Sequence, residues 1–348
     1  MRQKRGSRHG CPSQTVSPGK AHHMTDLSAK PPAKAPDGRI MSQQKFRLIT
    51  RSDFDGLVCA VLFREMDMID EILFAHPKDM QDGKIPVTRR DITCNLPYQD
   101  GVHLCFDHHV SEFYRNEDRN NHIIDPHAQS AARVVYEYYG GRMRFPNVAN
   151  DMMFAVDKAD SAQFTEQEIL DPQGWVLLSF IMEARTGLGR FRNFTVSNYQ
   201  LMLKLVDICR EYKDVNDILA LPDVAERVNL YEEHVEPYIN QVHACSEKYD
   251  NLIVLDLREE EILYAGNRFM IYALFPECDV SMHVMWGRQK QNTVFAVGKS
   301  IINRDNPINI GKLMLEYGGG GHAAAGTCQV DNDKASETMV ELIDRLTS

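Results

Sequence analysis

Strand and helix signals alternate along the first third of this chain, and this alternation limits the fold more than any other feature of the sequence. Residues 46–50 form a short apolar segment, and residues 57–66 after it have the composition of a helix. The alternation continues with strand signals at 71–75 and 102–106 and a helix signal at 130–139. Alternating strands and helices predict an α/β fold whose mostly parallel sheet is covered by helices on both faces.

The rest of the sequence divides into a helical stretch and a second α/β region. Residues 147–249 are patterned as helix almost throughout, and 223–249 have the length and charge of one long exposed helix. Strand signals follow at 251–257, 280–286 and 293–297, and helix signals at 308–317 and 334–346. We therefore predict a disordered tail over 1–40, an α/β domain over 41–195, a helical connector over 196–249 and a smaller α/β domain over 250–348.

The charge of the chain bears on the partners that it can have. Residues 1–40 contain eight Lys and Arg but only two Asp and Glu, although the whole chain carries a formal net charge of −10. The body of the protein is therefore acidic. An acidic body argues against a protein that coats long nucleic acids, but it is compatible with a local basic pocket for a short substrate.

The apolar runs and the cysteines indicate the cellular setting. The longest apolar runs, at 56–63 and 175–182, are about half as long as a transmembrane helix requires. The eight cysteines are scattered, which argues against a disulfide framework or a zinc ribbon, and the basic start lacks the apolar stretch of a secretory signal. We expect a cytoplasmic protein with no membrane partner. The oligomeric state stays open, a homodimer included.

Carboxylates and imidazoles gather where two of the expected strands end. Asp53 and Asp55 follow the first strand, and the run Asp107-His108-His109 follows the strand signal at 102–106. In parallel sheets, ligands bind beyond the carboxyl ends of the strands. Two aspartates in a loop are more often helix caps than metal ligands. A carboxylate and two imidazoles at a second strand end instead favour a site for manganese, iron or zinc.

Three further carboxylates could complete a metal centre. Asp91 lies near the end of an expected element, and Asp157 and Asp160 lie in a helical segment. Each of them alone is more typical of a surface charge. Together with the strand-end residues they are sufficient for two divalent ions, about 3.5 to 4 Å apart, that share a bridging carboxylate and support in-line attack on phosphorus.

A glycine run in the second α/β region is a candidate anion site. Residues 318–321 are all glycine and His322 follows them. Consecutive glycines let backbone N–H groups approach an anion, and the histidine adds a donor, whereas glycines alone would favour a flexible turn. Lys299 and Ser300, on a strand that leads toward the same face, are candidate phosphate contacts.

Basic residues in two other segments are also candidates for anion binding. Residues 185–192 contain three arginines, which fit a solvated loop or a phosphate site equally well, and Arg190 is our candidate contact there. The tripeptide Asn267-Arg268-Phe269 is a weaker signal of the same kind.

In the order of these motifs the chain resembles the DHH phosphoesterase superfamily. The motifs are D-x-D-G at 53–56, an isolated Asp91, D-H-H at 107–109, a later aspartate and G-G-G-G-H at 318–322. Residues 318–326 are also similar to the DHHA1 domain of nanoRNase and exonuclease members, and the resemblance covers 46–346. It implies an N-terminal DHH domain, a C-terminal DHHA1 domain and metal-dependent hydrolysis of phosphoester or phosphoanhydride bonds in the cleft between them.

The resemblance also implies roles for individual residues. The metal ligands would be Asp53, Asp55, Asp91, His108 and Asp157. Asp53 would bind the first ion, Asp55 the second and Asp91 both, and Asp160 is the alternative to Asp157. Asp107 would orient a ligand, and His109 would face the phosphate or the attacking water. A terminal phosphate or base of the substrate would be held by Gly319, Gly320, Gly321 and His322.

One position departs from the family pattern. Many members carry a histidine just before the first aspartate pair, where this chain has Thr50, Arg51 and Ser52. A guanidinium stays protonated, so Arg51 cannot bind a metal. We therefore expect the first metal site to be weaker than usual, or filled only with substrate bound.

The resemblance ranks the cofactors and substrates. Two Mn²⁺ ions are expected, with Mg²⁺ or Co²⁺ as alternatives. Short oligoribonucleotides or dinucleotides rank first as substrates, followed by small nucleotides such as 3'-phosphoadenosine 5'-phosphate, and then by polyphosphate, which would make the chain an exopolyphosphatase. Because of the missing histidine, a non-catalytic module that senses nucleotides remains the alternative from another class.

Overall fold

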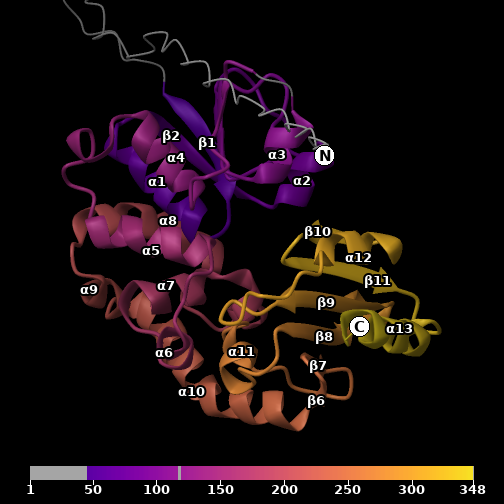
Figure 1. The fold of residues 1–348 in the computed structure, drawn as a ribbon. Coiled ribbons are helices and arrows are strands. Elements are labelled where there is room, and N and C mark those ends of the chain that lie inside the picture. Colours follow the sequence, from indigo (N-terminus) through magenta and orange to yellow (C-terminus); the bar gives the residue numbers. More distant parts are fainter. Residues whose placement is uncertain (1–44, 117–118, 348) are drawn as a thin grey trace, which may run out of the picture. The chain divides into compact units, whose positions relative to one another are not determined.

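The structure, a computed structural model, describes residues 45–116 and 119–347. The chain from Lys45 onward forms one compact unit, which contains two sheets and a set of helices (Figure 1). The predicted α/β class is confirmed. The tail predicted over 1–40 lies outside the described residues.

The first sheet has five parallel strands in the order β2-β1-β3-β4-β5. Its strands are β1 (Phe46–Arg51), β2 (Ile69–Ala75), β3 (Asp91–Cys94), β4 (Leu104–Asp107) and β5 (His122–Ile124). Because β1, β3 and β4 are neighbours and run in the same direction, their carboxyl ends meet at one edge of the sheet. The residues that follow β1 and β4 lie at this edge.

Helix α1 occupies the centre of the first core. The helices around this sheet are α1 (Phe54–Glu65), α2 (Pro77–Gln81), α3 (Val110–Arg115), α4 (Ala131–Tyr138) and α5 (Asn150–Asp160), with a short 3-10 helix η1 (Gly141–Met143). Every residue of α1 from Phe54 to Phe63 is buried. A helix that is apolar on all sides must be enclosed, and α1 contacts β1 as well as α4 and α5.

Helices fill the middle of the chain, as predicted. They are α6 (Glu166–Leu170), α7 (Gly174–Met182), α8 (Asn198–Glu211), α9 (Val215–Leu219) and α10 (Pro222–Ala244), with 3-10 helices η2 (Ala184–Thr186) and η3 (Leu188–Arg190). The long helix predicted over 223–249 is α10. It ends at Ala244 because the next residues pair with a neighbouring strand as β6.

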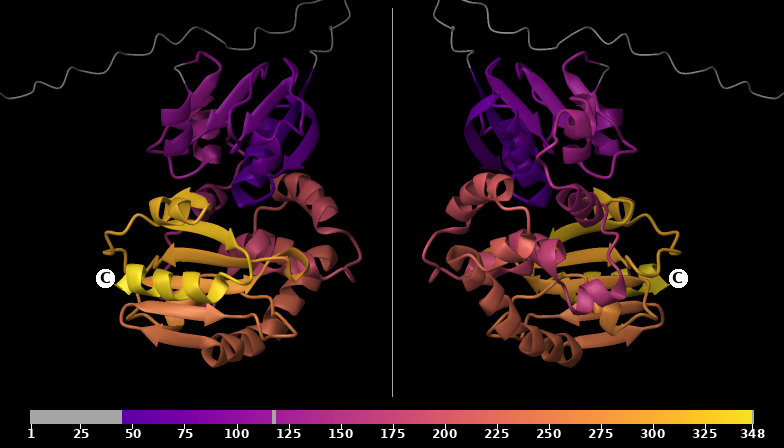
Figure 2. Two further views of the ribbon diagram at one scale, coloured as in Figure 1. Left: turned by 90° about the vertical axis from the view of Figure 1, so that its right-hand side faces the viewer. Right: turned by 90° about the vertical axis from the view of Figure 1, so that its left-hand side faces the viewer.

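The second sheet has six strands in the order β10-β11-β9-β8-β7-β6, and only β7 and β8 pair in parallel. The strands are β6 (Ser246–Tyr249), β7 (Leu252–Asp256), β8 (Val280–Trp286), β9 (Thr293–Lys299), β10 (Gly320–His322) and β11 (Ala325–Val330). The helices are α11 (Met270–Leu274), α12 (Ile310–Glu316), α13 (Ala335–Thr347) and the 3-10 helix η4 (Arg288–Lys290). Helix α13 lies across one face of this sheet (Figure 2), where Leu342 and Leu346 join its core.

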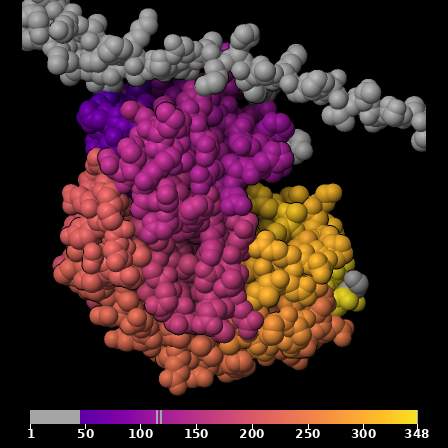
Figure 3. Space-filling view, turned by 60° about the vertical axis from the view of Figure 1, so that its left-hand side comes forward, coloured from indigo at the N-terminus to yellow at the C-terminus, as the bar shows by residue number. Residues whose placement is uncertain are grey.

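The helical segment is bound directly to the second α/β region. Phe164 and Phe180 share a buried core with Ile253 and Phe269. Arg304 Nη2 donates to the carbonyl oxygen of Ala162 at 2.6 Å. The two segments therefore border each other on the surface (Figure 3), so residues distant in the sequence can line one pocket.

None of the helices in the described part of the chain combines the length and the hydropathy that crossing a membrane requires.

Candidate functional site

Asp55 is held rigidly at the carboxyl edge of the first sheet. It lies in the first turn of α1, and its oxygens accept hydrogen bonds from the backbone N–H of Ala131 at 2.9 Å and of Ala132 at 2.7 Å, at the start of α4. Burial, together with the nearby charge of Asp160, raises the pKa of Asp55 to about 8. A cation beside this carboxylate would favour its charged form.

His108 presents one ring nitrogen to the same place. Its Nδ1 lies 3.2 Å from the carbonyl oxygen of Ala128, to which an Nδ1–H can donate. The other nitrogen, Nε2, lies 2.9 Å from Asp160 Oδ2 but is buried without a hydrogen bond of suitable geometry in the described structure. A backbone carbonyl that fixes the tautomer in this way is typical of histidines that bind metals through the other nitrogen.

Asp55, His108 and Asp160 together form a candidate metal centre. Their ligand atoms lie within 4.8 Å of one another, and within residues 45–116 and 119–347 they are the one group of three such side chains that meets this condition. Two carboxylates and an imidazole suit a divalent transition metal. The Nε2 of His108, buried without a hydrogen bond of suitable geometry in the described structure, and the raised pKa of Asp55 both fit a cation here, so these three residues would hold one ion.

The structure does not bring Asp157 to this centre. Ser130 Oγ donates to Asp157 Oδ1 at 2.7 Å, and Arg133 donates to Asp157 Oδ2 through Nε at 3.0 Å and Nη2 at 2.7 Å. The carboxylate of Asp157 thus ties α5 to α4. Asp160, the alternative in the sequence analysis, takes its place in the cluster.

The structure does not bring Asp91 to the centre either, because Asp91 begins β3 instead of following it. Its oxygens accept from Arg47 Nε at 2.7 Å, from the backbone N–H of Thr88 at 2.6 Å and from Thr88 Oγ1 at 2.9 Å. Four residues of strand, about 13 Å, separate Asp91 from the carboxyl edge. The residue that follows β3 at that edge is Asn95.

Asp53 lies at the carboxyl edge but has other partners. It caps α1 by accepting from the backbone N–H of Gly56 at 2.9 Å. Arg51 Nε lies 2.9 Å from Asp53 Oδ2, and Asn95 Nδ2 lies 3.3 and 3.4 Å from the two oxygens. Asp53 is therefore the helix N-cap that the sequence allows, and it also forms an ion pair with Arg51.

His109 is oriented by the last residue of β4. Asp107 Oδ1 accepts from His109 Nδ1 at 2.7 Å and from the backbone N–H of His108 at 2.8 Å. Burial lowers the pKa of His109, but the hydrogen bond that its Nδ1 donates to Asp107 raises it, and the net shift is upward. The ring of His322, in the second α/β region, lies 6.1 Å from the ring of His109. One histidine from each region thus faces the other.

The glycine run differs from the expected open loop. The N–H of Gly319 donates to the Met314 carbonyl oxygen at 2.9 Å and so closes the end of α12. Gly320 and Gly321 belong to the edge strand β10, where they pair with Thr327 and Gly326 of β11. The backbone donors are therefore partly used within the fold, whereas His322 is exposed at the end of β10.

The other predicted phosphate contacts have local partners. Lys299 Nζ donates to the Asn306 carbonyl oxygen at 2.7 Å, and Ser300 Oγ accepts from the N–H of Asn303 at 3.0 Å, so both residues shape the loop after β9. Arg190 Nη2 donates at 3.0 Å to the carbonyl oxygen of Leu263 and, also at 3.0 Å, to that of Tyr264. None of the three lines the pocket described next.

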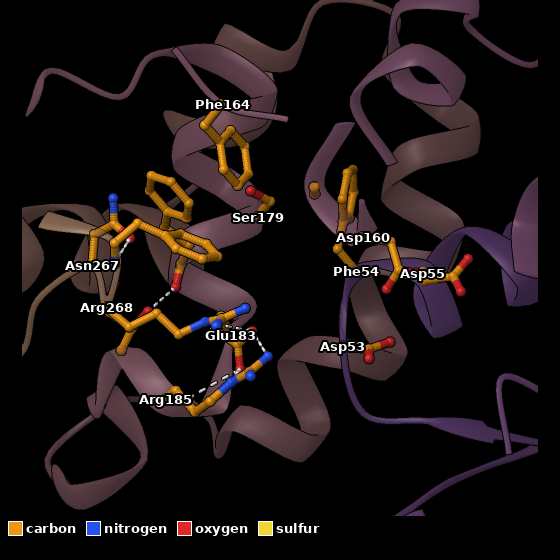
Figure 4. A pocket seen from close by; sticks show the side chains of 14 residues that line it. Asp53, Phe54, Asp55, Asp160, Phe164, Ser179, Glu183, Arg185, Asn267 and Arg268 are labelled. Carbon is orange, nitrogen blue, oxygen red and sulfur yellow. Dashed lines mark hydrogen bonds and ion pairs between the residues drawn. The ribbon is translucent and has the colours of Figure 1, made fainter. Parts of the chain in front are cut away.

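A pocket opens beside the candidate metal centre (Figure 4). One side is lined by Asp53, Phe54, Asp55 and Asp160. The other side is lined by Phe164, Phe180, Phe269, Glu183, Arg185, Asn267 and Arg268. The charged residues of this second side gather across the gap from Asp53 and Asp55. Aromatic rings and cations beside a metal centre suit a ligand that combines a base with phosphate.

The three charged residues on the far side of the pocket are not equivalent. Arg185 pairs with both oxygens of Glu183, through Nε at 2.8 Å and Nη2 at 2.6 Å. Arg268 Nε lies 3.9 Å from Glu183 and is buried without a hydrogen-bond partner in the described structure. Burial and the neighbouring Arg185 lower the pKa of Arg268 to about 10, so it stays charged at neutral pH. The trio carries one excess positive charge.

Most of this pocket could not be predicted from the sequence. Arg185 and Arg268 were recognisable only as members of basic segments, and the arginine selected there, Arg190, hydrogen-bonds outside the pocket. The short basic and aromatic segment at 267–269 was a sequence signal that pointed to residues of this pocket. The phenylalanines gave no signal, because nothing distinguishes them in the sequence from ordinary core residues.

Comparisons with known proteins decide the family. No family model and no curated protein matches the chain. Among solved structures, the pGpG-specific phosphodiesterase PggH from Vibrio cholerae shares 58% sequence identity with it, and the match covers 87% of this chain and 99% of that protein with a TM-score of 0.77. The chain belongs to the DHH phosphoesterase family. The resemblance of its motifs and the predicted metal-dependent phosphoesterase activity are thereby confirmed.

More distant structures are also similar to this DHH phosphoesterase. RecJ from Thermus thermophilus in complex with Mn²⁺ shares 13% identity at a TM-score of 0.48, over 87% of this chain and 52% of that one. CDC45 from Entamoeba histolytica shares 8% identity at a TM-score of 0.47, over 87% of this chain and 96% of that one. In this chain the five-stranded parallel sheet belongs to the DHH domain, and the six-stranded sheet belongs to the DHHA1 domain.

Proposed function

We propose that this chain is a Mn²⁺-dependent phosphodiesterase that hydrolyses the guanosine dinucleotide pGpG to two molecules of GMP. The observation that supports this substrate is the 58% identity to a pGpG-specific phosphodiesterase over 99% of that protein. In the reaction, water adds to the phosphorus of the linkage, the bond from phosphorus to the 3' oxygen breaks, and that oxygen takes a proton.

Asp55, His108 and Asp160 would hold the ion. Their mixed oxygen and nitrogen ligands favour Mn²⁺ over Mg²⁺, which prefers oxygen ligands and keeps several of its waters. Such an ion, when bound, stabilises negative charge on the phosphate oxygens during attack.

His109 and His322, one from each α/β region, would both act on the phosphate. His109 donates to Asp107 through Nδ1, so its Nε2 can hold the proton that the departing 3' oxygen takes. Burial and the positive charges of His109, Arg51 and Arg115 lower the pKa of His322, which keeps its ring neutral. Groups whose environments push their pKa values apart can divide acid and base roles between them.

The pocket would bind one guanine. A guanidinium pairs with the two acceptors O6 and N7 of guanine, whereas adenine presents a donor at the position of O6. Among the described residues, the buried Nε–H of Arg268 in the pocket has no hydrogen-bond partner, and its guanidinium carbon lies 4.0 Å from the centre of the Phe269 ring. The ring restricts where the guanidinium can move. Arg268 is therefore the best candidate for a residue that distinguishes guanine from adenine.

Replacing Arg268 with glutamine should reduce selectivity for guanine. A good bidentate contact is worth about 1 to 3 kcal/mol of discrimination, so kcat/KM on pGpG should fall by a factor of about 5 to 150 relative to that on pApA. Steady-state kinetics on both dinucleotides checks this. Arg288→Gln, an exposed change on the β8–β9 connection, is the matched control. Equal losses on both substrates would instead assign Arg268 to phosphate binding.

A panel of substrates tests the function itself. With Mn²⁺ added, the full chain should hydrolyse pGpG at least tenfold faster than pApA, a longer oligoribonucleotide or polyphosphate. Faster release of phosphate from polyphosphate would contradict the proposal in favour of an exopolyphosphatase. Tight binding of pGpG without turnover would favour the sensing module. A cytoplasmic location and a homodimer remain predictions from the sequence.

A further inference from the structure

The surroundings of Asp53 do not fit a second metal ion. All the partners of its carboxylate are hydrogen-bond donors, namely the backbone N–H of Gly56, the amide of Asn95 and the guanidinium of Arg51. A metal ligand at this position would need its lone pairs directed at an ion. Here Arg51 Nε, at 2.9 Å from Oδ2, already supplies a positive charge.

Two of the carboxylates that the sequence offered for a second site are also engaged elsewhere. Asp91 is held by Arg47 and Thr88 at the start of β3, and Asp157 is held by Ser130 and Arg133. The position that faces Asp53 from the end of β3 is occupied by Asn95, a neutral amide. An amide can donate to Asp53, whereas a carboxylate there would repel Asp53 unless a cation lay between them.

Arg51 is placed to act on a bound phosphate. About a third of its side chain is exposed, whereas the carboxylate of Asp53 is mostly covered. Asp53, whose Oδ2 lies 2.9 Å from Arg51 Nε, lines the pocket, so the guanidinium lies beside the pocket. Burial is the main cause of the lowered pKa of His322 and of Arg268, and the charge of Arg51 adds to it in both. A guanidinium is permanently charged and offers several donors in a plane, which suits contact with phosphate oxygens.

We propose that the guanidinium of Arg51 replaces the second metal ion, so that the chain binds one divalent cation at Asp55, His108 and Asp160, and Arg51 contacts the scissile phosphate. Asp53 then positions the arginine instead of binding metal, and Asn95 fixes Asp53. The phosphate contact rests on the proposed function. The count of one ion does not, because it follows from the ligands alone.

Metal stoichiometry tests the count without any substrate. Metal-free full-length protein is dialysed to equilibrium against Mn²⁺, and bound manganese is measured by elemental analysis and by electron paramagnetic resonance. We expect one Mn²⁺ per chain with the spectrum of an isolated ion. Two ions per chain with a spin-coupled spectrum, as for ions about 4 Å apart, would overturn the proposal.

A double variant tests whether Arg51 and Asn95 exclude the second metal ion. Arg51→His together with Asn95→Asp places an imidazole and a carboxylate beside Asp53, and the count should rise from one ion to two. A folded double variant that still binds one ion would show that these two residues do not exclude the second. Arg47→Gln, at the opposite end of β1, is the matched control and should leave the count at one.

A single variant separates the role of Arg51 at the phosphate from metal binding. Arg51→Ala should keep one Mn²⁺ per chain but lower kcat/KM on pGpG by roughly a hundredfold, the usual loss for one preorganised donor to a charged transition state. Undiminished turnover would overturn the phosphate contact. If the wild-type protein proves inactive on every dinucleotide, only the proposed function fails, and the metal count still decides the one-ion centre.

Discussion

Asp55→Asn is expected to abolish both metal binding and turnover. Asp55 is one of three ligands in the candidate centre, and an amide is a much weaker ligand than a carboxylate for a divalent cation. The lost charge stabilisation amounts to several kcal/mol, so kcat should fall by about a thousandfold or more. Thermal unfolding supplies a readout that does not depend on catalysis. Mn²⁺ at 100 times its Kd stabilises the wild-type fold by about 2.7 kcal/mol, and the variant should lose this gain.

Asp91→Asn is the control, because the sequence predicts Asp91 as a metal ligand whereas the structure places it away from the candidate centre. The variant loses part of the partnership with Arg47 and Thr88, so the protein should be less stable. Its Mn²⁺-dependent gain in melting temperature and its turnover at moderate temperature should remain. The opposite pattern, with metal binding lost in Asp91→Asn and kept in Asp55→Asn, would rule out the centre described here.

The contrast between these two residues shows how far a sequence determines a site. The parallel-sheet rule was sufficient to place Asp55 and His108 near each other, because both follow strongly apolar strands at one edge. Asp91 does not lie at that edge, because β3 is only four residues long and begins with the aspartate itself. Short strands carry little hydrophobic pattern, so the sequence did not reveal which end of β3 Asp91 occupies.

The choice between Asp157 and Asp160 could not be made from sequence for a different reason. Residues three apart on a helix lie on nearly the same side, about 60° apart around the axis. The tertiary structure separates them, since Asp157 meets α4 while Asp160, the last residue of α5, meets His108. Neither contact has a local signature in the chain.

The pocket beside the candidate metal centre depends even more on tertiary structure. Its lining comes from the start of α1, from α5 to η2 and from the segment before α11, which are more than a hundred residues apart at their extremes. The glycine run gave a misleading signal, because strand pairing and the end of α12 use donors that an isolated loop would leave free. The motifs therefore identified the family correctly, whereas the partners of some predicted residues depend on tertiary contacts.

Gly56→Ala is expected to damage the same site through the backbone. A Cβ at this position would lie 1.9 Å from the carbonyl oxygen of Arg51 and 2.8 Å from Thr50 Oγ1. A backbone carbonyl cannot rotate away as a side chain can, so the end of β1 must shift, and that segment carries Arg51 and leads into Asp53. In an unstrained helix the same change would be stabilising, because alanine is the better helix former by about 1 kcal/mol.

The clash should reverse that sign and cost about 1 to 3 kcal/mol of folding free energy, measured by chemical denaturation. A displacement of about 1 Å at the catalytic groups can cost a hundredfold, so turnover of pGpG should fall by about that factor while the protein is still folded. Gly189→Ala is the matched control, since a Cβ there would meet only Asn198 Nδ2 at 3.9 Å. Its stability and turnover should change little. Unaltered stability and turnover in Gly56→Ala would mean that the loop after β1 adapts without moving its charged residues, and that the glycine of this motif is not what places them.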